Sequence, residues 1–411
     1  MMARCLLTTS GPFVIMIPHR APVLIAIALF ALTGAEAQET HAGFVTTLGR
    51  DTVALESFRR TPARLEGDLL VRVPGTVLFH YRLDLRPDGT VSRSVVDIDP
   101  LGVSRFAAGH VTLDFGKDSV QVTVEELAQR RQSKVALDAK PVPFLMTGFE
   151  SSYGLYSSLG VIELLVSQMP VSATDTMLVS SIGLANGTKV KRKLMRRTAT
   201  TADVDYFLIA WTRMTTDEQG HILTVDMSQT TEKTQSTRTG FLNVRRMAEQ
   251  FATRDREGQG LGVASPNESV STNVDDATLS LRYGSPRTRG RKILGEVVSL
   301  DRVWRTGANE ATVFITNRDI TIGDVNVPTG TYTLYTLPTR TGVQLIINRQ
   351  HGQWGTSYDS TRDLARVAME TRTTVAVQEA FTIGVAGIAG SRAELRIAWD
   401  TFVWSVPIVV K

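Results

Sequence analysis

Cysteine is almost absent from this sequence of 411 residues, and histidine is scarce. The single cysteine, Cys5, precedes the segment that we expect to be cleaved off, so the mature chain would be cysteine-free, with no disulfide, thiolate metal site or cysteine nucleophile. The later histidines lie more than five residues apart, so no H-x-x-x-H or H-E-x-x-H motif occurs: His41, His80, His110, His221 and His351. We predict no metal and no cofactor.

A strong charge of one sign is also missing. The 45 Lys and Arg residues nearly balance 41 Asp and Glu residues, giving a net charge of +4. That balance is too even to indicate a nucleic-acid or membrane-surface partner. Two stretches are locally basic, Lys189–Arg197 and Arg287–Lys292. We predict no nucleic-acid partner, because these basic stretches lack interleaved aromatic residues. They would suit anionic lipid or envelope polysaccharide. For the first stretch we favour an edge strand whose basic side chains prevent aggregation.

The apolar run near the N-terminus is too short to cross a bilayer. Residues 21–32 form a run of 12 residues, whereas a spanning helix needs about 20. Arg20 precedes the run and Ala35-Glu-Ala37 follows it, which is the pattern of a secretory signal peptide. We predict a signal peptide over residues 1–37, with translation starting at Met1 or at Met16, and a periplasmic or extracellular protein with no membrane span after cleavage.

The remaining chain has mainly strand signals. Apolar and polar residues alternate over Val77–Arg86, a turn follows at Pro87-Asp-Gly89, and Thr90–Ile98 returns as a second strand. Such hairpins recur, which predicts a mainly β fold of two antiparallel β domains with few short helices. We place the helices at Phe149–Met169, Asn243–Arg256 and Ser360–Glu370.

A stretch rich in Gly, Ser and Asn divides the chain. We predict an N-terminal antiparallel β domain over residues 38–256, a linker over 257–272, and a C-terminal β-sandwich over 273–411. In the N-terminal domain, the long strand Val77–Arg86 and the apolar helix near Leu155–Met169 suggest a lipid-sized cavity.

Motifs in the C-terminal half occur in a characteristic order. They are Tyr283-Gly-Ser-Pro-Arg287, Val303-Trp-Arg-Thr-Gly-Ala-Asn-Glu-Ala-Thr312, Val327-Pro-Thr-Gly-Thr-Tyr-Thr-Leu334, Leu345-Ile-Ile-Asn348 and Gly352-Gln-Trp-Gly355 with Tyr358-Asp359. The series resembles the bacterial domain of unknown function 2911 family over about residues 273–411. The resemblance implies an exported bacterial β protein and supplies no activity. It departs from the family at Tyr283, where we expect Arg or Lys close before the proline.

Two polar clusters are candidate ligand sites. The first contains Trp304, Arg305, Asn309 and Glu310; the alternative is a hydrogen-bonded corner with Trp304 in the core, which we favour. The second contains His351, Trp354, Tyr358 and Asp359 and suits stacking on a sugar ring. Its alternative, which we also favour, is a hairpin loop whose aromatic residues cover the core.

Two functional classes remain open. The first is a non-catalytic cell-envelope protein that binds a glycan, a lipid or a protein. The second is a secreted hydrolase of carbohydrate or ester that uses carboxylates such as Glu310 and Asp359. We favour binding, because no Gly-x-Ser-x-Gly elbow or P-loop occurs. Catalytic residues and oligomeric state are left open.

Overall fold

The computed structural model describes residues 39–411 except 103–106, 127–128, 138–157, 183–188 and 207–209. Within these residues, strands form two antiparallel sheets, so the predicted mainly β class is confirmed. The N-terminal sheet contains β1 (Thr40–Leu48), β2 (Asp51–Thr61), β3 (Arg64–Val71), β4 (Val77–Leu85), β5 (Val91–Pro100), β6 (Gly109–Phe115), β7 (Ser119–Glu126), β8 (Gln129–Ala136), β9 (Met177–Ile182), β10 (Lys189–Thr198), β11 (Thr201–Tyr206), β12 (Ala210–Thr216), β13 (Ile222–Asp226) and β14 (Gln235–Thr239).

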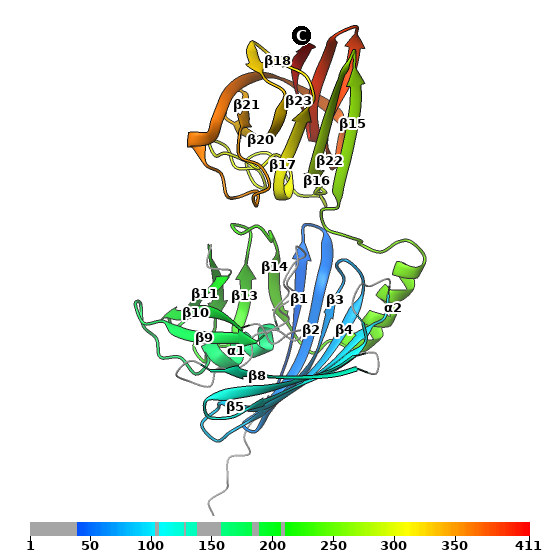
Figure 1. Cartoon of the computed structure of the whole chain (residues 1–411). Helices are drawn as coiled ribbons and strands as arrows, with labels where there is room; N and C mark the ends of the chain where they lie inside the picture. Colours follow the sequence, from blue (N-terminus) through cyan, green and yellow to red (C-terminus); the bar gives the residue numbers. More distant parts are fainter. Residues whose placement is uncertain (1–38, 103–106, 127–128, 138–157, 183–188, 207–209) are drawn as a thin grey trace, which may run out of the picture. The chain divides into compact units, whose positions relative to one another are not determined.

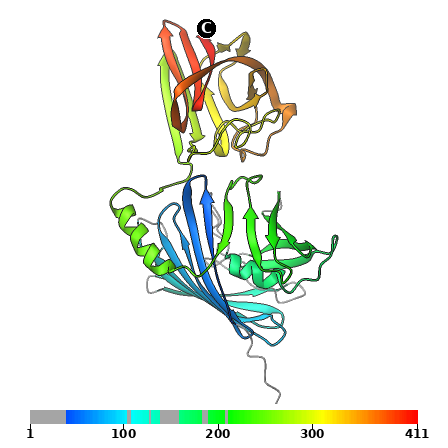
Figure 2. The same cartoon turned by 180° about the vertical axis from the view of Figure 1, so that it is seen from behind.

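The N-terminal sheet is a meander of described strands in which sequence neighbours pair, except β8 and β9. β1 also pairs with β14, so the sheet runs from β8 through β1 and β14 to β9. Strand twist accumulates over so many strands and curls the sheet. Figures 1 and 2 show it curving around helix α1 (Leu159–Val166). Near the two ends, the Lys189 ammonium on β10 donates to the Ala136 carbonyl on β8 at 3.0 Å.

The inner face of this sheet carries the main core. On β4, Val77, Phe79, Tyr81 and Leu83 all point into it, which confirms the period-two pattern predicted for this strand. All eight residues of α1 are buried in the same core. The helix predicted over Phe149–Met169 is therefore confirmed at α1, and its first part lies outside the described residues.

Helix α2 (Val244–Arg256) confirms the helix predicted from its amphipathic pattern, and it covers part of the outer face of the sheet. The Asn243 side chain caps its N-terminus by accepting a hydrogen bond from the Arg246 amide at 3.1 Å. Val244 and Ala248 of the helix pack with Leu70 and Leu78 of the sheet. Leu78, on the opposite face of β4 from Phe79, is therefore buried as well.

The basic strand β10 is not an edge. It pairs with β9 on one side and β11 on the other, so the edge-strand interpretation of Lys189–Arg197 is wrong. Two of its arginine side chains bind other residues of the same domain instead. Arg196 donates to the Glu218 carbonyl at 2.7 Å, and Arg197 forms an ion pair with the buried Asp203. The basic residues on an edge are those of β8, which is almost fully exposed.

The C-terminal sheet follows the order β15-β16-β17-β20-β21-β22-β23-β18-β19. Its strands are β15 (Asn267–Val274), β16 (Ala277–Gly284), β17 (Ala308–Thr316), β18 (Ile320–Ile322), β19 (Val325–Val327), β20 (Gly330–Pro338), β21 (Val343–Asn348), β22 (Asp363–Ala389) and β23 (Arg392–Val410). The long β22 pairs first with β21 and then with β23. Its later part contacts β15, where the Thr272 hydroxyl donates to the Val385 carbonyl at 3.0 Å.

The helix predicted over Ser360–Glu370 is wrong. A single 3₁₀ turn, η1 (Ser360–Arg362), is followed directly by strand β22. Val367 and Met369 are buried while Arg366 and Ala368 are exposed, so the residues alternate with a period of two rather than 3.6. In so short a segment, the spacing of the apolar residues does not distinguish the helical period of 3.6 residues from the strand period of two.

Candidate functional site

Helix α1 is held at its N-terminus by a buried carboxylate. Glu56 on β2 is 2 % exposed and accepts hydrogen bonds from the Ser158 and Tyr81 hydroxyls, each at 2.6 Å, and from the Leu159 amide at 2.7 Å. Negative charge is favoured at this end of a helix. The approach is close: a Cβ on Gly160 would lie 2.9 Å from the Tyr81 hydroxyl oxygen. Burial raises the pKa of Glu56, and these hydrogen bonds offset part of that effect.

A second buried carboxylate fixes the body of the helix. Glu163 is 1 % exposed and pairs with Arg238 of β14, with Nη1 2.5 Å from Oε2 and Nη2 3.4 Å from Oε1. The Ile222 amide donates to the same Oε2 at 2.8 Å. At the end of the helix, Arg60 donates to the Ser167 hydroxyl at 2.8 Å. Helix α1 is therefore a fixed part of the core, tied to strands from both halves of the sheet.

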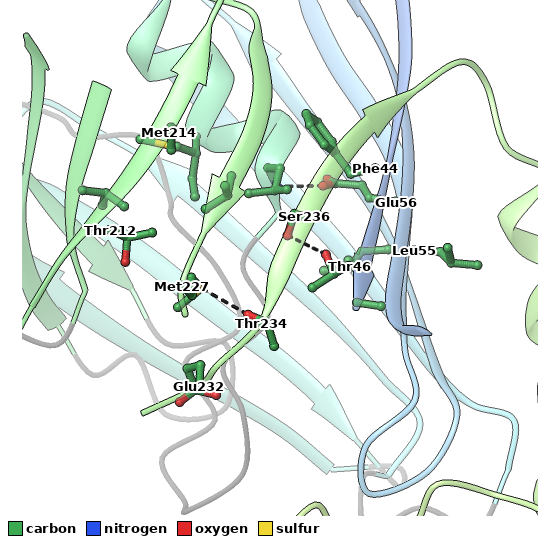
Figure 3. Close-up of a pocket in the computed structure, with 16 residues that line it drawn as sticks. Phe44, Thr46, Leu55, Glu56, Thr212, Met214, Met227, Glu232, Thr234 and Ser236 are labelled. Carbon is green, nitrogen blue, oxygen red and sulfur yellow. Dashed lines mark hydrogen bonds between the residues drawn. The ribbon is translucent and has the colours of Figure 1, made fainter. Parts of the chain in front are cut away.

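A pocket lies beside α1 on the inner face of the sheet (Figure 3). Strands β1–β3, helix α1, strands β11–β14 and the turn before β14 contribute its lining: Phe44, Thr46, Ala54, Leu55, Glu56, Leu69, Leu159, Ile162, Val204, Thr212, Met214, Val225, Met227, Glu232, Thr234 and Ser236. Most of the exposed wall is apolar. The free space is about 40 Å³, room for about three water molecules or a comparable ligand group.

This space is much smaller than the lipid-sized cavity suggested by the strand lengths. Helix α1 occupies the concavity, and large side chains such as Phe44, Phe58 and Phe79 fill most of what it leaves. Two methionines, Met214 and Met227, form part of the remaining wall. Because methionine side chains are flexible, they can adjust to the shape of a small guest.

The polar groups of the pocket differ in what they bond. The Thr46 and Ser236 hydroxyls bond each other at 2.8 Å, and the Thr234 hydroxyl contacts the Met227 sulfur at 3.5 Å (Figure 3). Thr212 is 1 % exposed, yet its hydroxyl has no hydrogen-bond partner among the described residues. Burial raises the pKa of Glu232 to about 7. Among the described residues that line the pocket, none is Lys, Arg or His.

The C-terminal sheet brings parts of the two predicted clusters together. The Gly355 amide donates to the Asn309 carbonyl at 2.9 Å, and Glu310 forms an isolated β-bridge with Trp354. Glu310 is exposed and Trp354 is 39 % exposed, so both reach solvent beside each other along the backbone. Arg305 instead turns back to the chain, donating to the Gly307 and Asn309 carbonyls at 3.3 and 3.4 Å.

The other residues of these clusters have local roles. Trp304 stacks on Trp399 with ring centroids 5.9 Å apart, within the core. The Tyr358 hydroxyl donates to Asp363 at 2.6 Å; burial, reinforced by that carboxylate, raises the pKa of Tyr358 to about 12. The Asp359 carboxylate accepts from the Thr361 amide and hydroxyl at the start of η1. His351 is exposed.

The sequence does not identify the pocket residues, because they come from eight separate elements. One signal was available for the carboxylates that fix α1. Glu56 and Glu163 each interrupt an apolar segment, Val-Ala-Leu-Glu-Ser-Phe58 and Leu-Gly-Val-Ile-Glu-Leu-Leu-Val166. A charged residue within an apolar segment indicates that its side chain is buried together with an ion-pair or hydrogen-bond partner. Nothing in the sequence near Thr212 distinguishes it from the other threonines of its strand.

Comparisons with known proteins identify only the C-terminal part. Residues 265–408 match the family described as "Protein of unknown function (DUF2911)", so the predicted resemblance is confirmed, and no family matches the N-terminal part. No curated protein matches the chain. A crystal structure of a DUF1089 family protein from Pseudomonas aeruginosa is similar over 42 % of this chain and 89 % of its own, at 12 % identity and a TM-score of 0.29.

Metal-ligating residues do not cluster in the described part of the chain: no group of three or more His, Cys, Asp or Glu there is arranged to hold an ion. Likewise, none of the helices within the described ranges has the length and hydropathy needed to cross a membrane.

Proposed function

We propose that this protein is an exported bacterial envelope protein that binds a small amphipathic ligand, without catalysis, in the pocket beside α1. The observation that carries the proposal is the combination of unfilled space, apolar walls and an unpaired buried hydroxyl at Thr212. Protein cores are close-packed, so empty space next to an unsatisfied polar group is an unusual feature of a core. A small, mostly apolar ligand that occupies the space makes the van der Waals contacts that the empty space lacks.

The size of the pocket limits the ligand. About 40 Å³ accommodates about three heavy atoms, so a probe such as 1-butanol is expected to enter the pocket with only its apolar end. Small ligands gain at most about 1.5 kcal/mol per heavy atom. Five heavy atoms then gain at most about 7.5 kcal/mol, so the dissociation constant is expected to be no lower than about 3 μM. Titration calorimetry and methyl NMR measure affinities of this order.

Filling the pocket is expected to abolish binding. Val225→Leu adds a methylene to the wall of the pocket, where there is space to receive it, so we expect at least tenfold weaker 1-butanol binding and little loss of stability. Val179→Leu is the matched control, since Val179 is fully buried in the same core but does not line the pocket. It is expected to bind as the wild type does and to unfold more easily. Equal binding by wild type and Val225→Leu would contradict the proposal.

Export rests on residues 20–37, the basic residue, short apolar run and Ala35-Glu-Ala37 described above. These residues lie outside the described part of the chain. N-terminal sequencing of the protein recovered from outside the cytoplasm tests this part of the proposal, with Gln38 expected as the first residue. A mature protein that retains residues 21–32 would overturn it.

Glycan binding is a second candidate, favoured by one observation: exposed Trp354 and Glu310 lie side by side at a β-bridge. An indole face and a carboxylate suit a sugar ring and its hydroxyls. We expect Trp354→Ala to weaken binding of cellotetraose at least tenfold if this site is used, whereas Trp211→Ala, which removes a similarly exposed tryptophan, leaves it unchanged. Reducing ends released from cellotetraose, and lost in Glu310→Gln, would instead favour the hydrolase.

A further inference from the structure

Two residues mark the place where the pocket beside α1 reaches solvent. Met227 and Glu232 are partly exposed, whereas all the other residues of the described lining are buried. Met227 directly follows β13, and Glu232 lies in the turn that leads into β14, at the lower end of the lining in Figure 3. A guest therefore enters the pocket past these two side chains, with its apolar end inside and its polar group beside them.

The carboxylate of Glu232 accepts no hydrogen bond from the described residues. Its own backbone amide donates to the Thr230 hydroxyl at 3.1 Å. The ammonium of the neighbouring Lys233 is used elsewhere, since it donates to the Ser228 carbonyl at 2.8 Å. Glu56, the other carboxyl group of the lining, is already occupied by the donors that begin α1. Glu232 is therefore the polar group of the lining that is both partly exposed and able to accept from a guest.

The electrostatic surroundings of Glu232 leave its charge poorly compensated. Burial raises its pKa to about 7, and this effect exceeds the opposing attraction of Arg305. The Arg305 guanidinium forms no ion pair with it and donates instead to the Gly307 and Asn309 carbonyls at 3.3 and 3.4 Å. A carboxylate that has lost water and gained no donor is stabilised by a cation that donates hydrogen bonds to it.

We propose that the ligand of this pocket is a primary alkylamine, whose apolar end fills the space beside α1 and whose ammonium group binds the Glu232 carboxylate at the mouth. The preference for an amine rests on the proposed ligand-binding function of the same pocket. An ammonium group supplies the positive charge that the described lining lacks, together with three N–H donors. An anionic head group would instead meet two carboxyl groups and no cation in that lining.

The test compares three ligands of equal chain length, butylamine, 1-butanol and butyrate, by titration calorimetry on the full protein at about pH 8. Glu232→Gln keeps the shape of the side chain and removes its charge. Glu218→Gln is the matched control, since Glu218 is exposed before β13 and does not line the pocket. We expect wild type and Glu218→Gln to bind butylamine about fivefold or more tighter than 1-butanol, and butyrate more weakly than either, because charge-assisted hydrogen bonds are stronger than neutral ones. Glu232→Gln is expected to bind butylamine no more tightly than 1-butanol.

The pH profile of the wild type tests the same contact without any variant. Butylamine, like a lysine side chain with a pKa of about 10.4, stays protonated at neutral pH, whereas Glu232, with a pKa of about 7, ionises around neutral pH. Butylamine binding is therefore expected to strengthen about tenfold from about pH 6 to 8, while 1-butanol binding does not strengthen. Burial also raises the pKa of Glu56 and lowers that of Lys233, and Arg305 stays charged. An equally large pH dependence in Glu232→Gln would assign the effect to one of these groups and overturn the proposal.

Stability separates a binding role of Glu232 from a structural one. Glu232→Gln removes a carboxylate that has no hydrogen-bond partner, so its melting temperature at about pH 8 is expected to equal or exceed that of wild type. Unchanged butylamine binding by Glu232→Gln, the result expected if Arg305 already neutralises the carboxylate, would overturn the preference for an amine. Wild-type binding of 1-butanol as tight as that of butylamine would also overturn it, while leaving the pocket function standing. Absence of binding of all three ligands to wild type would overturn the function itself.

Discussion

Arg238→Ala is expected to destabilise the N-terminal sheet by about 3–5 kcal/mol, because it leaves the carboxylate of Glu163 buried without its partner. Glu163 is 1 % exposed and sits on a helix whose residues are all buried, so water cannot take over the role of the guanidinium. The Ile222 amide still donates to the carboxylate but does not neutralise it. The same replacement removes the bond from Arg238 to the Ile222 carbonyl, at 3.0 Å.

The loss is measured by urea unfolding, with hydrogen–deuterium exchange of peptides covering α1 and β14 as the readout for this sheet. Arg59→Ala is the control, since its ion pair with Glu66 is half exposed and is worth about 0–1 kcal/mol. Combining Arg238→Met with Glu163→Leu removes both charges and is expected to recover much of the loss. A loss for Arg238→Ala no larger than for Arg59→Ala would show that α1 is not held by this pair.

Glu56→Ala is the second large effect. It removes the acceptor shared by the Leu159 amide and the Tyr81 and Ser158 hydroxyls, all buried, and it opens a void where α1 begins. Each unsatisfied donor costs about 1–3 kcal/mol, so a total of about 3 kcal/mol or more is expected. Glu56→Gln keeps the volume and one carbonyl acceptor and is expected to lose much less. Equal losses for the two variants would mean that the hydrogen bonds do not hold the helix.

Glu56 also predicts a pH dependence. A carboxyl group with a raised pKa in the fold binds its proton more tightly there than in the unfolded chain. The contribution of the Glu56 carboxyl group to the free energy of unfolding therefore falls as the pH rises above 4.5, the ordinary pKa of a glutamic acid side chain. Urea unfolding of wild type and Glu56→Gln at several pH values from about 4 to 8 measures it. The difference in stability between the two proteins is expected to shift in favour of Glu56→Gln as the pH rises; a constant difference would contradict the assignment.

The elements that the sequence predicted well are those with long, regular patterns. The alternation over Val77–Arg86 and the amphipathic pattern of Asn243–Arg256 both give the observed element, because a repeated period leaves little choice. The segment Ser360–Glu370 was wrongly predicted as a helix because it is short. The basic stretch Lys189–Arg197 was wrongly assigned to an edge because strand order depends on pairing between strands, which local charge does not reveal.

The candidate sites show the same limit. The clusters around Trp304 and Trp354 were found because their residues are close in sequence, and β17 and the loop before β22 do bring Asn309, Glu310 and Gly355 together. The pocket beside α1 was not found. Thr46 and Ser236 are 190 residues apart, and only the pairing of β1 with β14 places their hydroxyls 2.8 Å from each other.

The most direct measurement is a titration of the full protein with 1-butanol, followed by NMR of methionine methyl groups. Met214 and Met227 line the pocket, whereas Met369 is buried in the core of the C-terminal sheet and serves as an internal control. Ligand binding in the pocket predicts saturable shifts of the Met214 and Met227 signals, with Met369 unmoved and the shifts lost in Val225→Leu. Signals of Met214 and Met227 that stay in place, or that drift together with Met369 without saturating, would contradict it.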